Sequence, residues 1–394
     1  MRILAIETSC DETGIAILDA SGTLARPKFR VLSNIAASQI AVHKRFGGVV
    51  PNLAKREHQR NLVSVLIKAL KEARLRNSNF QLPRLRPGFS GQAISKKLKT
   101  LQEIFSHEPE LLKNFMRVIP KITPPTIDAI AVTYGPGLAP ALWTGVNFAR
   151  ALSLIWKKPL IPVNHLAGHI YVNLIRGKLI HFPALALIVS GGHTELVLMK
   201  KLNKYKIIGE TQDDAAGEAF DKVAKMLKLG FPGGPAISAL ADNFKNQKIK
   251  NKNSLPRPML NSKNYDFSFS GLKTAVLYYL RDNPRAGKSQ KGRAAIAREF
   301  QNAVVETLVA KTIRAAKGYK VKTIILGGGV AANKKLRRDL AAKIAADLPK
   351  VNLLLPEVPE TTDNALMIGA AAFFARQKKT AWRHLHADPG LRLA

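Results

Sequence analysis

Apolar and polar residues follow one another in two places in the order that is typical of a β-hairpin with a polar turn. The first is ILAIETSCDETGIAILD, residues 3–19, where Thr, Ser, Asp and Glu separate two apolar runs. The second is ALALIVSGGHTELVLMK, residues 184–200, where a Ser-Gly-Gly-His-Thr segment separates two further apolar runs. Because the same plan recurs near the middle of the chain, the pattern indicates an internal duplication.

Each hairpin pattern is followed by a β-rich run, a glycine turn and a helical pattern, at residues 127–152 and 321–344. Glycine at such a turn lets backbone N–H groups approach a phosphate, and the N-terminus of the next helix favours negative charge. One glycine turn could be a simple chain reversal, but these turns recur in matched positions. The sequence therefore predicts an α/β protein with a two-lobed actin/hexokinase/Hsp70-like fold, duplicated β-hairpin-containing halves and a nucleotide cleft between them.

The chain has 394 residues, which is longer than chains that usually fold around a single hydrophobic core. We expect an N-terminal lobe at 1–160, completed by a C-terminal helix at about 364–378, a C-terminal lobe at 161–363 and a basic tail at 379–394. Residues 76–125 break the pattern with a basic Pro- and Gly-rich loop and the apolar spacing of two short helices. This insertion and the basic stretch 245–258 are either solvated surface or nucleic-acid contacts.

Charge and cysteine content narrow the class of protein. The chain carries 62 Lys and Arg against 27 Asp and Glu, a net charge of +35, which favours a polyanionic partner such as nucleic acid. A proteome rich in lysine is the alternative explanation. The single cysteine, Cys10, excludes an intramolecular disulfide. We see no signal-peptide pattern and no apolar run of roughly 18 residues, so we expect a cytoplasmic protein without a membrane span.

Two histidines stand four residues apart in NHLAGHIYV, with Asn164 as a candidate N-cap of their helix. His165 and His169 would share one helix face, at the spacing that a single metal ion needs. Buried, hydrogen-bonded imidazoles are an equal alternative. The residues between them are Leu, Ala and Gly, so the glutamate base of an HExxH metalloprotease is missing.

Asp363 precedes an apolar helical run and could supply a third ligand to that metal. On the simpler interpretation it caps the helix, a role that its neighbours Thr361, Thr362 and Asn364 could also take. An oxygen ligand from this position would complete a two-histidine, one-carboxylate site with coordination positions left open for a substrate.

Ten motifs follow one another over the chain outside residues 76–125 and the tail after about 378: ETSCDETG, FGGVVPNLAKREH, GPGL, NHLAGH, VSGGHTEL, DDAAGEAFDKVAK, FPGGP, DFSFSGLKT, GGGVAAN and TTDNALMIG. In this order they resemble the tRNA adenosine threonylcarbamoyltransferase family. The family was formerly described as an O-sialoglycoprotein endopeptidase, and the first motif is similar to its bacterial and organellar branch.

The resemblance implies transfer of a threonylcarbamoyl group from threonylcarbamoyl-AMP to N6 of the adenosine 3′ of the anticodon, in tRNAs that read codons starting with A. It implies His165, His169 and Asp363 as ligands of a divalent metal, with iron(II) favoured over zinc, and Asp11 and Glu12 as catalytic residues. The implied substrate-binding residues are Ile188, Val189, Ser190, Gly191, Gly192, Asp221, Gly234 and Asn333.

The implied partners are tRNA, a smaller paralogous subunit and an ATPase subunit of the transfer complex. Many relatives carry Glu at the position of Ala167 and Cys at that of Thr361, so the choice of metal is open. Two other functions remain as alternatives: a non-catalytic scaffold of the same fold, which we would expect to lack the histidine pair, and an ATPase or kinase, which would use carboxylates and Mg²⁺.

Overall fold

The computed structural model describes residues 1–75, 91–242 and 255–393, and the side chains of 91–96 are not described. Its internal contacts divide the chain into two compact units. Unit 1 comprises Met1–Gln39, Val49–Leu179 and Asp363–Arg392, and unit 2 comprises Ile40–Gly48, Ile180–Thr362 and Leu393. The lobe boundary expected at residue 160 lies inside unit 1 in this division, as do residues 379–392 of the expected tail.

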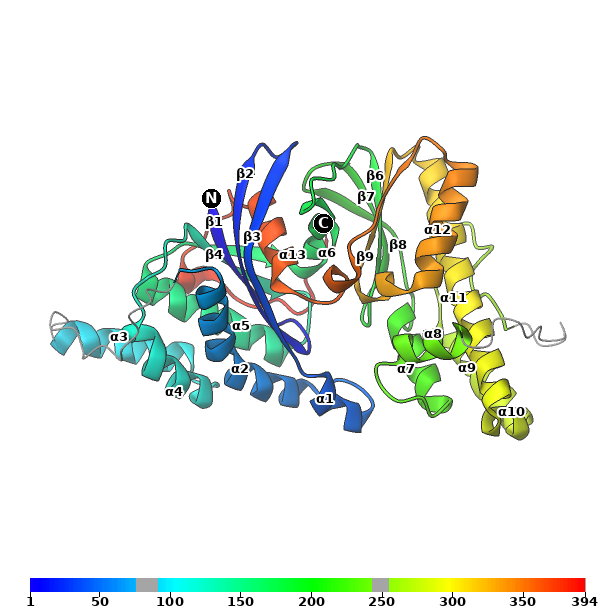
Figure 1. The fold of residues 1–394 in the computed structure, drawn as a ribbon, viewed down its shortest axis with the longest axis horizontal. Coiled ribbons are helices and arrows are strands. Elements are labelled where there is room, and N and C mark those ends of the chain that lie inside the picture. Colours follow the sequence, from blue (N-terminus) through cyan, green and yellow to red (C-terminus); the bar gives the residue numbers. More distant parts are fainter. Residues whose placement is uncertain (76–90, 243–254, 394) are drawn as a thin grey trace. The chain divides into compact units, whose positions relative to one another are not determined.

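Unit 1 is built on a five-stranded sheet of order β3-β2-β1-β4-β5 (Figure 1). The antiparallel part contains the predicted hairpin of β1 and β2, to which β3 is added, and β4 and β5 continue the sheet in parallel from β1. The strands are β1 (Arg2–Glu7), β2 (Glu12–Gly22), β3 (Pro27–Ser38), β4 (Ala129–Gly135) and β5 (Leu160–Asn164).

Unit 2 repeats this topology in the order β8-β7-β6-β9-β10. The second predicted hairpin joins β6 to β7, β8 adds to β7, and β9 and β10 run parallel to β6. The strands are β6 (Ala184–Val189), β7 (Thr194–Lys201), β8 (Lys204–Glu210), β9 (Thr323–Gly327) and β10 (Asn352–Leu354). Two sheets with one connectivity confirm the predicted fold class of duplicated α/β halves.

Helices cover both faces of the unit 1 sheet. Leu4 and Ile6 of β1 point into a core that α2 and α5 close, whereas α13 packs on the other face, where Gly369 lies against Leu18 and Ala5. A Cβ at Gly369 would come within 2.0 Å of Leu18 Cδ2, so α13 lies unusually close to the sheet. The helices of this unit are α2 (Pro51–Glu72), α3 (Gly91–Ile104), α4 (Pro109–Val118), α5 (Ala139–Trp156), α6 (His165–Tyr171) and α13 (Ala365–Phe374), with short 3-10 turns η2 (Ile119–Lys121), η3 (Val172–Leu174) and η6 (Trp382–His384).

The two helices expected after the basic loop are present as α3 and α4. They belong to the core of unit 1, because Leu101, Phe105, Leu111 and Phe115 are buried in it. The loop itself, residues 76–90, lies outside the described residues, as do residues 245–254 of the second basic stretch. In its remaining part, Arg257 forms ion pairs with Glu299 and Glu306.

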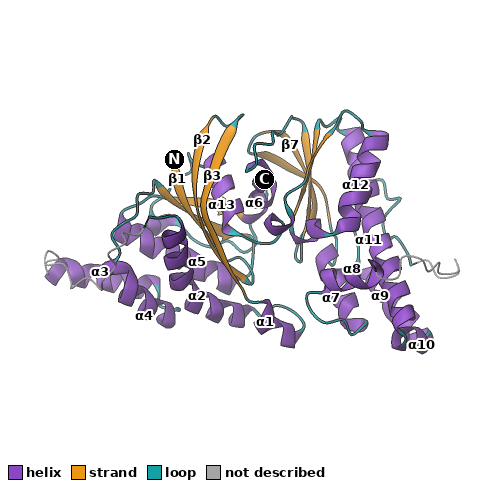
Figure 2. Cartoon of the chain, in the orientation of Figure 1, coloured by secondary structure: helices purple, strands orange, loops and turns teal. Residues whose placement is uncertain are grey.

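The core of unit 2 lies between its sheet and a group of helices dominated by the 29-residue α11 (Figure 2). Every helix in the described ranges is too short or too polar to cross a membrane. The helices are α1 (Ile40–His43), α7 (Ala216–Met226), α8 (Gly233–Asp242), α9 (Ser270–Asp282), α10 (Pro284–Lys288), α11 (Gln290–Gly318) and α12 (Lys334–Asp347), with 3-10 turns η1 (Lys44–Phe46), η4 (Gly329–Ala332) and η5 (Val358–Glu360).

Candidate active site

Helix α6 carries both histidines and begins at the end of β5. The side-chain oxygen of Asn164 accepts hydrogen bonds from the backbone N–H groups of Leu166 and Ala167, at 2.8 and 3.2 Å, which confirms the predicted N-cap. All seven residues of α6 are buried. The rings of His165 and His169 lie with their centroids 4.8 Å apart, so one face of the helix presents both.

Asp363 faces these histidines from the loop before α13. Its Oδ1 lies 3.4 Å from Nε2 of His165 and 3.2 Å from Nε2 of His169. The cap of α13 is Asn364, whose side-chain oxygen accepts from the N–H of Met367 at 3.1 Å. The simpler interpretation of Asp363 as the helix cap is therefore wrong, and its carboxylate is directed to α6.

The donor atoms of His165, His169 and Asp363 all lie within 4.8 Å of one another, a spacing that one metal ion can bridge. Within the described part of the chain, neither ring nitrogen of His169 makes a well-directed hydrogen bond, although both are buried and Nε2 lies 3.2 Å from Asp363 Oδ1. A buried polar atom without a partner is costly, and a cation between the three side chains would satisfy the Nε2 atom. The residues present therefore fit a divalent metal.

The local electrostatics also favour positive charge. Burial disfavours a charged ring at His165, but the carboxylates of Asp363 and Glu7 outweigh it and raise the pKa of His165 to about 9. Burial lowers the pKa of His169, and the neighbouring His165 lowers it further. Positive charge is thus favoured between the carboxylates of Glu7 and Asp363, and a divalent cation would supply it while both rings stay neutral.

Of the predicted catalytic residues, Asp11 lies in the turn between β1 and β2, and Glu12 is the first residue of β2. Asp11 is buried, and the pKa of Glu12 is raised to about 10 by burial and by the negative charges of Asp11 and Asp363. The same causes raise the pKa of Cys10. Since Asp363 contributes to both shifts, the structure brings the acidic turn and the histidine–aspartate cluster into one region of unit 1.

His58 of α2 holds this turn, a contact that sequence reasoning missed. Its Nε2 lies 3.0 Å from the Cys10 carbonyl oxygen, which can only accept, so Nε2 carries the proton. Nδ1 then accepts from the hydroxyl of Thr13 at 2.8 Å. His58 closes the motif FGGVVPNLAKREH, but a histidine on a long amphipathic helix gives no sign of which turn it contacts.

The Ser-Gly-Gly turn of unit 2 follows β6, of which Ile188 and Val189 are the buried last residues. The N–H of Ser190 donates to the carbonyl of His193 at 2.8 Å, and the Ser190 hydroxyl accepts from Gly192 and His193. A Cβ at Gly191 or Gly192 would meet nothing within 4 Å. The N–H of Ser190 is therefore used in a hydrogen bond within the turn, and the space beside Gly191 and Gly192 is open.

Asp221, Gly234 and Asn333 belong to the same unit. Asp221 Oδ1 accepts from the N–H of Gly233 at 2.7 Å, which joins α7 to the start of α8, and Gly234 has open space where a Cβ would stand. Asn333 caps α12 through its oxygen and donates its amide to Ser238 and Gln301. The structure thus collects the predicted substrate-binding residues in unit 2 and the predicted metal and catalytic residues in unit 1.

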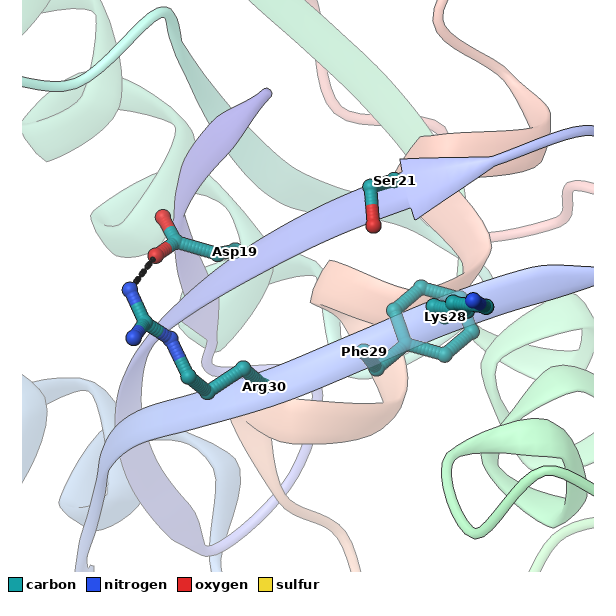
Figure 3. A pocket seen from close by; sticks show the side chains of 5 residues that line it. All are labelled: Asp19, Ser21, Lys28, Phe29 and Arg30. Atoms are coloured by element: carbon teal, nitrogen blue, oxygen red, sulfur yellow. Dashed lines mark hydrogen bonds and ion pairs between the residues drawn. The ribbon is translucent and has the colours of Figure 1, made fainter.

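A hollow of about 340 Å³ lies on the β2–β3 hairpin (Figure 3). Asp19 and Ser21 line it from β2, and Lys28, Phe29 and Arg30 line it from β3. Asp19 is paired with Arg2 and Arg30, which lower its pKa to about 2. None of the predicted site residues lines this hollow. The carboxylate that does line it, Asp19, is already neutralised by Arg2 and Arg30.

Comparison with known proteins adds a family match. A family model described as tRNA N6-adenosine threonylcarbamoyltransferase matches residues 30–82 and 107–370. Curated proteins described by the same words are similar over the whole chain. One from Thermosipho africanus is 41% identical over 394 residues, covering 100% of both chains. One from Enterococcus faecalis is 41% identical over 390 residues, or 99% of this chain and 94% of the relative.

Solved structures show weaker similarity. Full-length HypF in its phosphate- and nucleotide-bound form has a TM-score of 0.47 and 14% identity, covering 68% of this chain and 49% of that chain. A ROK hexokinase from Thermus thermophilus has a TM-score of 0.40 and 12% identity, covering 96% of this chain and 99% of that chain.

Proposed function

The chain belongs to the tRNA N6-adenosine threonylcarbamoyltransferase family, and from this membership and the convergence of His165, His169 and Asp363 we propose a specific reaction. The protein takes the threonylcarbamoyl group from threonylcarbamoyl-AMP and places it on N6 of the adenosine 3′ of the anticodon, in tRNAs that read codons starting with A. The observation that carries this proposal is the three-residue cluster, which a non-catalytic scaffold would not need.

The chemistry explains why a metal is useful. The lone pair of an adenine N6 amine is delocalised into the ring, so the carbonyl that it attacks must be made more electrophilic. A divalent metal, iron(II) in preference to zinc, would act as a Lewis acid on this carbonyl or on the adjoining phosphate. His165 and His169 would hold it through Nε2 and Asp363 through Oδ1, the atoms that face one another.

The chain's own residues carry out the proton transfer that accompanies departure of AMP. As the bond from N6 to the carbamoyl carbon forms, the bond from that carbon to the phosphate oxygen breaks and AMP leaves. A proton must leave N6 in the same process, and we assign its acceptance to the Asp11 carboxylate, with Glu12, which its raised pKa keeps protonated, as the hydrogen-bonded second member of the catalytic pair. His58 keeps this pair in place by its hydrogen bond to the Cys10 carbonyl.

The adenylate would be held by the unit 2 residues. The turn after β6 lies at the carboxyl end of a strand that runs parallel to β9, the usual place for a nucleotide in an α/β sheet. Open space beside Gly191, Gly192 and Gly234 supports close approach of a ligand to the backbone. The residues proposed for this role are Ile188, Val189, Ser190, Gly191, Gly192, Asp221, Gly234 and Asn333.

The net charge of +35 supports tRNA as the macromolecular substrate. By analogy with the family, we further propose that the protein works in the cytoplasm with a smaller paralogous subunit and an ATPase subunit.

Complementation of a strain that lacks the modification tests this function. Nucleoside mass spectrometry of its tRNA should detect N6-threonylcarbamoyladenosine when the wild-type chain is expressed, and a His165→Ala variant at equal abundance should restore none. Modification restored in full by His165→Ala would contradict the metal role, and no modification by the wild type alongside its partner subunits would contradict the function itself.

A further inference from the structure

The last residue of β1, Glu7, is a fully buried carboxylate at the edge of the cluster. Its Oε1 accepts from the backbone N–H of Ser9 at 2.5 Å, and its Oε2 accepts from the hydroxyl of Thr133 on β4 at 2.5 Å. Both oxygens are therefore oriented by the adjacent strand and by the chain's own turn. Ser9 is fixed in turn, because its carbonyl accepts from the N–H of Leu138 at 2.8 Å.

A buried carboxylate normally has a cationic partner. Among the described residues, no lysine or arginine forms an ion pair with Glu7, and the group that faces it is the ring of His165. Nδ1 of His165 lies 3.3 Å from Oε2 of Glu7, and 3.1 Å from the hydroxyl oxygen of Ser9. Nε2, on the opposite side of the ring, is directed to Asp363.

This arrangement fixes which nitrogen is available to a ligand. In the neutral ring that a metal binds, a carboxylate that accepts at Nδ1 favours the tautomer with the proton there and leaves the lone pair on Nε2, the atom that faces Asp363 and His169. His169 differs, because no hydrogen-bond partner for its Nδ1 exists within the described part of the chain. A carboxylate thus contacts the Nδ1 side of the His165 ring, whereas none contacts the Nδ1 side of the His169 ring.

We propose that Glu7 is a positioning residue, which orients the His165 ring and holds its proton on Nδ1 so that Nε2 can bind the divalent metal of the proposed site. This inference rests on the metal site proposed above. It adds a fourth side chain, from β1, that contacts neither the metal nor the substrate and acts through His165. A carboxylate behind a metal-bound histidine typically strengthens metal binding by 10- to 100-fold.

Metal affinity of the full-length, metal-stripped protein tests the proposal. Zinc is titrated against a chromophoric chelator, and a Glu7→Gln variant should bind it about 10- to 100-fold more weakly than the wild type. Gln has a single acceptor oxygen for the three donors that the Glu7 carboxylate now serves. In protein loaded with cobalt(II), the visible absorption bands of the site should shift in Glu7→Gln, a readout that a general loss of stability would not move.

Two matched variants serve as controls. Thr133→Val removes another hydrogen bond of Glu7 but leaves its contact with His165, so zinc affinity and the cobalt bands should stay close to the wild type. Ser9→Ala removes the competing acceptor at Nδ1. If Ser9→Ala weakens binding and Glu7→Gln does not, Ser9 holds the ring and the proposal is wrong.

The outcomes separate this inference from the metal site itself. If the wild type binds zinc, His165→Ala does not, and Glu7→Gln binds as the wild type does, Glu7 has no positioning role while the site stands. If the wild type binds no zinc, iron or cobalt, both fail. Should Glu7→Gln not fold, Glu7→Asp keeps the charge but withdraws it from Nδ1, and unchanged affinity in that variant also overturns the proposal.

Discussion

The two histidines of α6 differ in how their rings are held. His165 lies between the carboxylates of Glu7 and Asp363, whereas both ring nitrogens of His169 are buried without a well-directed hydrogen bond in the described part of the chain, and its Nε2 faces Asp363 at 3.2 Å. Burial of a polar group without a good hydrogen bond destabilises the fold, so a ligand that binds this group is expected. At the residue scale, the case for a metal therefore rests on His169 as much as on the convergence of three donor atoms.

Lys311 of α11 is another buried polar residue, and it predicts a dependence of stability on pH. Burial and the charge of Arg314 lower its pKa to about 8, although its ammonium donates to the hydroxyl of Ser262 at 2.8 Å. The unfolded chain keeps its proton up to the ordinary value of 10.5. Between pH 8 and 10.5 the unfolded state binds more protons, so the contribution of Lys311 to the free energy of unfolding rises with pH.

A Lys311→Met variant should therefore be more stable than the wild type at pH 7, with the advantage shrinking by at most about 1.4 kcal/mol per pH unit above pH 8. Urea unfolding at pH 7, 8, 9 and 10 measures this difference. An advantage that is constant across the range would show that the charge of Lys311 is not the cause.

The sequence predicted some of these residues and could not predict others. The spacing of His165 and His169 on one helix face was visible, Asp363 was a candidate from its place before an apolar helix, and the resemblance to a family supported all three. Glu7 was not visible, because an acid at the end of an apolar strand looks like the first residue of a polar turn. Only the register with β4 places it beside Thr133 and His165, and register depends on contacts over more than 120 residues.

At the scale of elements, α6 and α13 bring the ligands together. They pack at Gly168, where a Cβ would come within 3.0 Å of Met367 Cγ. The sequence predicted both helices and the N-cap of α6 at Asn164. It could not predict that residues 161–179 join unit 1, because that depends on β5 pairing with β4 and on the bridge from Leu160 to Thr380.

The cap of α6 gives a prediction at this scale. Asn164→Ala removes the acceptor for two N–H groups of the first turn and should cost about 1 kcal/mol of stability. Because His165 is the first residue of that turn, zinc affinity should fall as well. The matched control is Ser289→Ala, which removes the cap of α11 in unit 2. Calorimetry measures the stability of both variants, and zinc titration measures their metal affinity. An equal loss of zinc affinity in the two variants would contradict this account.

At the scale of the whole molecule, the charge of +35 is the main feature that the fold does not explain. It is expected to act on tRNA through release of counterions from phosphates. The two insertion helices contribute to the core through Leu101 and Phe115, so deleting residues 76–125 would test the fold and not the charge.

The salt dependence of tRNA binding tests the role of this charge more directly than such a deletion would. If six to ten phosphates are neutralised, tRNA affinity should fall by about 10³- to 10⁵-fold between 50 and 200 mM salt, linearly on logarithmic axes. Fluorescence anisotropy of labelled tRNA would show this, with a neutral peptide nucleic acid of the same anticodon-loop sequence as the control. A slope near zero would mean that the excess charge does not contact tRNA.

The central claim is that unit 1 binds a metal through α6 and the loop before α13 and uses it to modify tRNA. Its most direct test is single-turnover transfer from supplied threonylcarbamoyl-AMP to tRNA in the presence of the partner subunits, followed by nucleoside mass spectrometry. The wild type and a His181→Ala variant, in which the changed histidine is exposed, should form N6-threonylcarbamoyladenosine at the same rate. The rate of His169→Ala should fall to that measured without enzyme. Transfer by His169→Ala at the wild-type rate would contradict the account.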